Sequence, residues 1–244
     1  MTAPAGPFAA VERAAATLGL HLTDAQLDAC ARYGAALVEA NASVNLTAIT
    51  DPDDIALKHF LDSFTAHAVR AWSGREKLVD VGSGAGFPGL ALQIALPGIA
   101  VTCVEATGKK ARAIEGFRDL LHLQRAEVEN ARAEDLVRTS AHRERYDVAT
   151  ARALGSLAHC VELLFPFLRV GGDAIVWKGR VDAELHSAER ALAALGGGSV
   201  TIVPTASLGL AEELPGRSLV VMRKDRSTPD VYPRTPAEMK RRPW

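Results

Sequence analysis

The sequence predicts an α/β fold: a doubly wound, mostly parallel sheet with helices on both faces. Two observations support this prediction. Residues 78–89 read LVDVGSGAGFPG, in which an apolar, strand-like run breaks into a glycine turn, and residues 90–96 continue with helical composition. From residue 77 to about residue 195, strand-like and helix-like segments then alternate, which is the pattern of repeated βαβ units.

The glycine turn has the chemistry of a cofactor site. Glycine tolerates positive φ angles, and the absence of a Cβ lets a ligand approach the backbone closely. Asp80 precedes the turn, and its carboxylate suits the sulfonium and amine of S-adenosylmethionine (SAM) better than a pyrophosphate. The sequence therefore favours SAM, with a dinucleotide or a purely structural turn as the alternatives. The turn glycines are Gly82, Gly84, Gly86 and Gly89, of which the last three satisfy the dinucleotide pattern G-x-G-x-x-G.

Length and composition narrow the class of protein. A chain of 244 residues with 48% hydrophobic residues can form one large α/β domain with an appended subdomain. No apolar run approaches the ~20 residues of a membrane span, and the N-terminal MTAPAGPFAA lacks the pattern of a secretory signal. Cys30, Cys103 and Cys160 are far apart, so we expect a reducing, cytoplasmic location and no metal site. The net charge of −1 limits nucleic-acid binding to local basic patches.

Residues 1–74 have a helical pattern and are expected to form a cap or substrate subdomain. Alanine-rich and amphipathic stretches alternate there with residues that cap helices, including Thr23 and Asp51. The expected elements are a helix over residues 8–20, a second helix from the Thr23–Gln26 capping box to Ala40, a polar loop at residues 41–50, and a third helix from Asp51 to about Trp72.

Residues 75–224 are expected to form the cofactor-binding domain. Alternating strands and helices are followed by two final strands that we expect to pair antiparallel. This gives the seven-stranded, Rossmann-like sheet typical of SAM-dependent methyltransferases. The expected strands are residues 78–81, 100–105, 126–129, 146–151, 173–177, 200–204 and 218–223, and the expected helices are residues 89–95, 108–123, 154–168 and 182–195.

Three further positions at the ends of strands are candidates for ligand contacts. Glu105 ends the second strand, where a carboxylate can accept both ribose hydroxyls of an adenosine; a solvated carboxylate at the sheet edge is the alternative. Ala133 and Glu134 follow the third strand, where a backbone N–H and a carboxylate can read adenine, although Glu134 could instead form a surface ion pair with Arg132. Arg152 follows the fourth strand and is expected to hold the cofactor or a phosphate.

Seven short stretches between Asn45 and Arg223 are similar to one family. They read, in order, NLTAIT, KHFLDSF, LVDVGSGAGFPG, EATGKKARAI, RAED, ARAL and WKG. Together they resemble the bacterial GidB family, whose members methylate N7 of a guanine in the decoding region of 16S ribosomal RNA. The resemblance implies SAM as cofactor and 16S ribosomal RNA, a 30S subunit or an assembly particle as partner. In one departure, Ala113 and Ile114 stand where the family has Phe-Leu, a change that concerns helix packing.

The resemblance also implies site residues. Some of them allow a second interpretation: His59 could be structural, Lys110 could be a solvated helix start, and Trp177 could stack on a base or pack in the core. The SAM site would be lined by Gly82, Phe87, Glu105, Ala106, Thr107, Ala133, Glu134 and Arg152, beside Asp80, Gly84 and Gly86 of the turn. RNA or the reaction centre would be approached by Asn45, His59, Lys110, Arg132, Lys178 and Arg217.

The expected chemistry needs no catalytic acid or base. N7 of guanine carries a lone pair and no proton, so it can attack a sulfonium methyl directly once the reactants are held in line. The Asn/Asp-Pro-Pro-Tyr word of amino methylation does not occur, and Cys103 lies within an apolar strand, which disfavours a cysteine nucleophile. Two other classes stay open: a nicotinamide-dependent oxidoreductase, whose Tyr-x-x-x-Lys pair does not occur here, and a non-catalytic RNA-binding or ribosome-assembly protein.

Residues 225–244 are expected to form a basic C-terminal tail. From Arg223 to Trp244 the chain has seven Lys or Arg against three Asp or Glu, a local charge of +4 in a chain of net charge −1. Four prolines in this segment are expected to prevent a helix. We therefore expect an extended arm that binds RNA phosphates, with a solubilising terminus as the alternative, on a monomeric protein.

Overall fold

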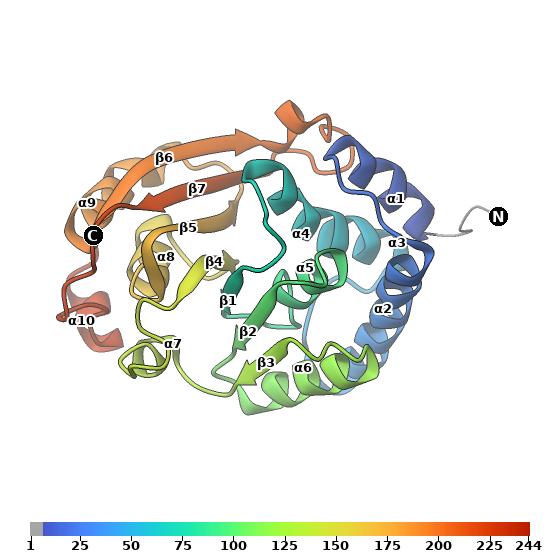
Figure 1. The fold of residues 1–244 in the computed structure, drawn as a ribbon, viewed down its shortest axis with the longest axis horizontal. Helices are drawn as coiled ribbons and strands as arrows, with labels where there is room; N and C mark the ends of the chain where they lie inside the picture. The colour runs from blue at the N-terminus through green and yellow to red at the C-terminus, as the bar shows by residue number, and fades with distance from the viewer. Residues whose placement is uncertain (1–6) are drawn as a thin grey trace.

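The computed structural model describes residues 7–244 and contains the expected α/β fold (Figure 1). Residues 1–6, which include most of the N-terminal stretch inspected for a secretory signal, lie outside the described residues. A seven-stranded sheet has the order β3-β2-β1-β4-β5-β7-β6. The strands are β1 (Lys77–Val81), β2 (Ala100–Val104), β3 (Ala126–Glu129), β4 (Tyr146–Arg152), β5 (Leu168–Lys178), β6 (Gly197–Pro204) and β7 (Ser218–Lys224).

The pairing of the strands confirms the expected topology. β1 to β5 pair in parallel, whereas β7 pairs antiparallel with both β5 and β6. β5 begins at Leu168, earlier than expected, because Leu168 pairs with Tyr146 ahead of a register shift. The strand order reverses between β1 and β4, because β2 and β3 lie beyond β1 while β5, β7 and β6 lie beyond β4. Ligands of such sheets bind next to this reversal, outside the carboxyl ends of the strands.

Helices cover both faces of the sheet over two hydrophobic clusters. Side chains alternate along β1, so Leu78 packs into one cluster and Val79 into the other. The first face is covered by α5 (Gly89–Ala95), α6 (Gly108–Leu120) and the N-terminal helices. The second face is covered by α7 (Ala133–Leu136), α8 (Leu157–Leu164), α9 (Leu185–Leu195) and α10 (Pro236–Arg241).

The N-terminal cap begins with α1 (Pro7–Thr17) and α2 (Asp24–Val44). The Thr23–Gln26 capping box is confirmed. The expected loop at residues 41–50 is shorter than predicted, because α2 continues to Val44 and ends only where Asn45 adopts a left-handed conformation with φ of 54°.

The expected third helix is broken into shorter segments. They are α3 (Pro52–Ile55), a π-helical turn (Ala56–Leu61), α4 (Asp62–Phe64) and a 3-10 turn (Thr65–Val69). Side chains outside this segment take up its carbonyl groups: Arg152 donates to Lys58 O at 3.0 Å, and Trp177 Nε1 donates to Asp62 O at 2.7 Å. These contacts compete with the regular α-helical pattern, which explains why the prediction of one uniform helix was wrong.

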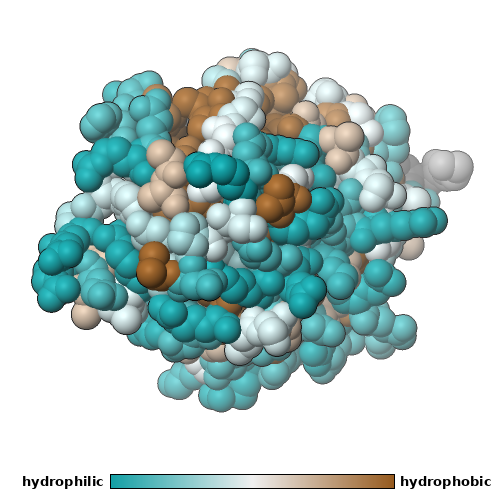
Figure 2. Space-filling view, turned by 60° about the vertical axis from the view of Figure 1, so that its left-hand side comes forward, coloured by the Kyte–Doolittle hydropathy of each residue, from teal (hydrophilic) through white to brown (hydrophobic). Residues whose placement is uncertain are grey.

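The C-terminal segment is folded against the domain, so the expectation of an extended arm was wrong. Pro236 stands at the start of α10, where its missing N–H has no intrahelical role, and Thr235 and Glu238 form a capping box. Arg234 and Trp244 both donate to the buried Glu162 of α8. Figure 2 is turned so that the side of α9 and α10 comes forward, and the face it shows is largely hydrophilic with some hydrophobic residues.

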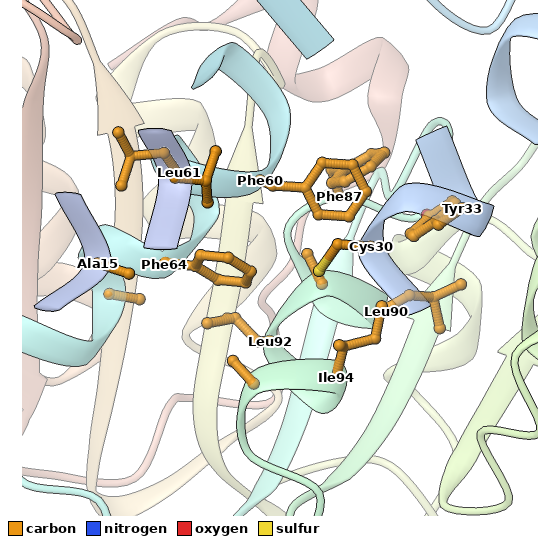
Figure 3. Packing of buried hydrophobic residues seen from close by; sticks show 14 of the residues in the cluster. Ala15, Cys30, Tyr33, Phe60, Leu61, Phe64, Phe87, Leu90, Leu92 and Ile94 are labelled. Carbon is orange, nitrogen blue, oxygen red and sulfur yellow. The ribbon is translucent and has the colours of Figure 1, made fainter. Parts of the chain in front are cut away.

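An aromatic group joins the cap to the glycine turn. Tyr33 of α2 stacks on Phe87 with ring centroids 4.7 Å apart, and Phe60 contacts both rings edge-on (Figure 3). Tyr33 also donates a hydrogen bond of 2.5 Å to Ala85 O. The cap therefore packs on the turn itself.

Among the described residues, no helix has the length and apolar composition needed to cross a membrane.

Candidate functional site

A cavity of about 760 Å³ lies at the carboxyl ends of the parallel strands, a volume typical of a site for a small ligand. One wall, the strand-end wall, consists of residues at or just after the ends of β1 to β5, and the opposite wall comes from the cap. The strand-end wall includes Gly82–Ala85, Phe87, Glu105, Ala106, Arg132–Glu134, Arg152–Gly155 and Trp177–Gly179. The cap wall consists of Leu46, Thr47, Ile49, Lys58 and His59.

The glycine turn has the backbone geometry that its sequence predicts. Gly82, Gly84 and Gly86 have φ angles of 72°, 60° and 88°, a region that other residues rarely adopt. Gly82 and Gly84 line the cavity, but Gly86 does not. A Cβ at Gly86 would lie 2.5 Å from Tyr33 Oη, so this glycine makes room for the cap rather than for a ligand.

Asp80 is not where the sequence predicted it. The carboxylate is fully buried beneath the glycine turn and does not line the cavity. Its Oδ2 accepts from Gly89 N at 3.1 Å and its Oδ1 accepts from Thr150 Oγ1 at 2.9 Å. Burial raises the pKa of Asp80 to about 6, although these hydrogen bonds act in the opposite direction. Asp80 therefore holds the turn against α5 and β4.

Glu105 lies at the cavity, as predicted, and its side chain has a definite orientation. It is almost fully buried, which excludes the alternative of a solvated carboxylate. Oε2 accepts from Gly84 N at 3.0 Å, and Oε1 accepts from Thr107 N at 2.8 Å. Ala106 lines the cavity, whereas Thr107 precedes α6 as its N-cap and lies outside the lining. Each carboxylate oxygen keeps a second lone pair, so Glu105 can accept hydroxyl groups of a ligand.

The residues after β3 also reach the cavity. Arg132, Ala133 and Glu134 line it, with Ala133 and Glu134 buried and Arg132 exposed. The burial of Glu134 argues against a solvated surface pair with Arg132.

Within residues 7–244, no group of three or more His, Cys, Asp and Glu side chains could hold a metal ion.

Arg152 belongs to a network that the sequence did not reveal. Its NH1 donates to Asp62 Oδ2 at 3.1 Å, and its NH2 lies 3.0 Å from His59 Nδ1. Arg217 Nε lies 3.2 Å from Asp62 Oδ1 but off the hydrogen-bonding direction, so in the described chain this oxygen has an ionic partner and no aligned hydrogen bond. Burial raises the pKa of Asp62, and the two arginines oppose this shift only in part.

His59 is a buried residue at the cavity wall. Its ring stacks on Phe87 with centroids 4.9 Å apart, and its Nε2 lies 3.0 Å from Thr47 Oγ1. Burial and the positive charge of Arg152 lower the pKa of His59 to about 3, so the imidazole is neutral at physiological pH. His59 is therefore packed as a structural residue and also lines the cavity, while its contact to RNA stays a prediction.

The remaining candidates divide between the cavity and the core. Lys110 and Lys178 line the cavity, and Lys178 Nζ donates to Gly155 O at 2.8 Å. Trp177 is buried, and its N–H donates to Asp62 O and Thr65 Oγ1, so its ring is fixed in the core and only borders the cavity. Asn45 caps α2 and does not line the cavity.

Sequence reasoning missed the two residues that organise the cap wall. Asp62 interrupts the apolar run HFLDSF, and a lone carboxylate on the buried side of a helix signals a charged partner. Thr47 lies in the NLTAIT stretch, but no local pattern in the sequence indicates that this residue lines the cavity.

A sheet of this order, with a positive-φ glycine turn after β1 and a carboxylate after β2, defines a Rossmann-like methyltransferase fold. A solved structure described as a "predicted O-methyltransferase", from Agrobacterium tumefaciens, has this fold with a TM-score of 0.52 and 20% identity, over 69% of this chain and 81% of that chain.

The chain belongs to the GidB family. The family model, described as rRNA small subunit methyltransferase G, matches residues 26–212. Two proteins named Ribosomal RNA small subunit methyltransferase G are similar over nearly their whole length. The one from Leuconostoc citreum is 41% identical over 92% of this chain and 94% of that protein. The one from Roseiflexus castenholzii is 42% identical over 95% of this chain and 97% of that protein.

Proposed function

We propose that this protein transfers the methyl group of SAM to N7 of a guanine in 16S ribosomal RNA. The observation that carries the proposal is the identity of about 40% to small-subunit rRNA methyltransferases over more than nine-tenths of the chain. The cavity supports it, because it combines a glycine turn, an oriented carboxylate and a separate wall for a second reactant.

The residues at the strand ends fit SAM as the cofactor. Glu105 is held by two backbone N–H groups and has free lone pairs for ribose hydroxyls. Ala133 and Glu134 line the cavity and would contact adenine, and Gly82 and Gly84 allow close approach to the backbone. When bound, SAM supplies an electrophilic methyl group on a sulfonium centre.

The protein's part in this reaction is to position the reactants rather than to move a proton. Guanine N7 has no proton to lose, and alignment of two reactants with exclusion of water contributes on the order of 7–11 kcal/mol. The side chains around the cavity agree with this. His59 is neutral with both ring nitrogens in hydrogen bonds, and Asp80 lies behind the turn.

Exposed cations around the cavity supply the contacts that RNA phosphates require. Lys58 and Arg132 are exposed, and Lys110 is partly exposed, all at the cavity wall. Arg217 presents its guanidinium there with about a third of its side chain exposed. We include in the proposal a 30S subunit or assembly particle as the natural substrate, a monomeric state and a cytoplasmic location.

The C-terminal segment retains a second set of exposed cations despite being folded. Lys240, Arg241 and Arg242 are exposed on α10 and just after it. If they contact RNA, replacing all three by glutamine reduces the slope of log affinity against log salt concentration by about 2, since each phosphate contact contributes about 0.7 for single strands. Filter binding at several salt concentrations measures this slope, and an unchanged slope makes the segment structural only.

Transfer of tritiated methyl from SAM to ribosomal RNA tests the proposed function. The protein is incubated with naked 16S RNA and with 30S particles, and the labelled nucleoside is identified as 7-methylguanosine or another product. A nicotinamide-dependent oxidoreductase would instead show thermal stabilisation by NAD(H) and not by SAM. A non-catalytic assembly protein would bind RNA without transferring label at saturating SAM, and either result would overturn the proposal.

A further inference from the structure

The cap wall of the cavity is built around one threonine, Thr47, in a loop that a single side chain fixes. Asn41 Oδ1 accepts from Leu46 N at 2.7 Å and from Thr47 N at 2.9 Å, and Asn41 Nδ2 donates to Thr47 O at 2.9 Å. These three bonds hold the backbone of Thr47 from the last turns of α2. The position of the Thr47 side chain at the cavity is therefore well determined.

The protonation of His59 follows from its neighbours. A guanidinium is always protonated and only donates, so Arg152 NH2 must donate to His59 Nδ1, which lies 3.0 Å away. A neutral imidazole that accepts at Nδ1 carries its proton on Nε2. That proton points to Thr47 Oγ1, 3.0 Å from Nε2.

The hydroxyl oxygen of Thr47 consequently has no acceptor capacity left. It accepts one hydrogen bond from His59 Nε2 and a second from Ile49 N, which is 3.0 Å away. A hydroxyl oxygen has two lone pairs, and both are used. Its own proton has no acceptor among residues 7–244 in the observed hydrogen bonds, while the side chain lines the cavity and is partly exposed. Thr47 thus offers the cavity a donor that cannot act as an acceptor.

We propose that the Thr47 hydroxyl donates a hydrogen bond to O6 of the target guanine and so distinguishes guanine from adenine, with His59 as the residue that orients this proton. The inference rests on the proposed function. In guanine, O6 and N7 are neighbouring acceptors on the same edge, whereas adenine has an N6 amino donor in place of O6. A base presented with N7 toward the methyl group has O6 beside it, and a fixed donor there accepts guanine and repels adenine.

The position of Thr47 favours the base over the cofactor as its partner. The groups suited to SAM, such as Glu105 and Glu134, follow strands of the sheet, while Thr47 comes from the cap on the other wall. Leu46 and Ile49 flank it in the same wall and offer apolar surface, which suits the face or edge of a purine.

The test compares two substrates and two variants. Wild type, Thr47→Val and Thr47→Ser are assayed for methyl transfer from SAM into 16S RNA or reconstituted 30S particles. The target nucleotide is either guanosine or 2-aminopurine, a purine that keeps N7 and lacks O6. Loss of one hydrogen bond of this kind corresponds to about a tenfold effect. We expect Thr47→Val to reduce the guanine to 2-aminopurine ratio of kcat/KM about tenfold, and Thr47→Ser to retain the wild-type ratio.

Controls separate this effect from a loss of folding or of the proposed function. Thr139→Val is a matched change, because among residues 7–244 the Thr139 hydroxyl bonds only to the nearby Leu136 O and does not line the cavity, and it should leave the ratio unchanged. A Thr47→Val protein that loses activity equally on both substrates overturns the inference, as does one that loses SAM affinity in calorimetry while the ratio stays at the wild-type value. A wild-type protein that does not methylate guanine N7 at all overturns the proposed function as well.

Discussion

The cap and the C-terminal segment are both attached to the domain by a buried carboxylate that faces arginine, but the two carboxylates differ. Glu162 accepts four hydrogen bonds, three from Arg234 and one from Trp244. Asp62 accepts one aligned hydrogen bond, from Arg152, although two arginines surround it. Both side chains are inaccessible to solvent, but Asp62 lies deeper in the protein than Glu162 does.

The pKa directions follow from the depth of burial together with the hydrogen bonding. Burial acts to raise both values, but at Glu162 the hydrogen bonds outweigh it and the pKa is lowered, whereas at Asp62 the pKa stays raised. Glu162 therefore has hydrogen bonds to both of its oxygens, whereas Asp62, whose partner Arg152 lines the cavity, has an aligned hydrogen bond to only one of its own among the described residues.

The largest expected change in stability comes from breaking the contact between Glu162 and the C-terminal segment. Arg234→Ala leaves Glu162 ionised and buried with Trp244 as its remaining side-chain partner, and breaking such a pair costs about 3–5 kcal/mol of unfolding free energy. Urea unfolding measures the change. Arg242→Ala, on an exposed neighbour, should stay within about 0.5 kcal/mol. Equal effects of the two variants would show that Glu162 does not hold the segment.

Asp80, a third buried carboxylate, gives the next largest effect, which is a pH dependence. Its pKa is raised from 3.8 to about 6, so the folded protein binds this proton more tightly than the unfolded chain does. Ionisation of Asp80 therefore lowers wild-type stability by about 3 kcal/mol as pH rises from about 4 to about 7. Asp80→Asn, which can still bond to Gly89 and Thr150, should lose this part of the slope in urea unfolding. An unaltered slope contradicts the assignment.

Glu105 differs from these three because it faces the cavity. Glu105→Gln should weaken SAM binding by roughly 10- to 150-fold, which corresponds to the loss of hydrogen bonds to a charged group. Asp80→Asn is the matched control, since its side chain lies behind the same turn, and SAM affinity should change less than about threefold. Calorimetric titration of both variants decides, and the reverse order of effects would move the cofactor away from Glu105.

The smallest effect on stability is expected at Asp62. The folded state disfavours its ionised form, so the neutral variant Asp62→Asn should change unfolding free energy by less than about 1 kcal/mol at pH 7. Its cost relative to wild type should grow as the pH falls through the raised pKa of the wild-type Asp62 carboxyl, because the folded protein then gains the bound proton. The activity should fall, because Arg152 and Arg217 lose their anchor. If Asp62→Asn were strongly destabilised at pH 7, the ionised Asp62 would contribute to stability as Glu162 does, and the contrast between them would be wrong.

The sequence was sufficient for features that depend on neighbours in the chain. The strand, glycine turn and helix around Gly82 and the Thr23 capping box are local, and both were predicted correctly. The capping box at Thr235 and Glu238 is equally local, but the nearby prolines were given more weight than their positions justify. The prediction that this segment contains no helix was therefore wrong because the prolines were misinterpreted, and not because the sequence lacked the signal.

Other features could not be predicted because they depend on distant contacts. Asp62 meets Arg152 and Arg217 far along the chain, and no local pattern fixes such pairings. Asp80 is an intermediate case. Side chains alternate along a strand, and Leu78 packs toward α5, so Asp80 had to point to the same face rather than to the ligand.

The cap and one face of the sheet share a single hydrophobic cluster, and Tyr33 of the cap bonds to the glycine turn. In terms of hydrogen exchange, such elements belong to one cooperative unit, so amides in the core of α2 should exchange only when β1 also opens. A cap of this kind is not a module that moves on a hinge. The cap wall and the strand-end wall of the cavity are therefore assembled in a single folding event, before any ligand binds.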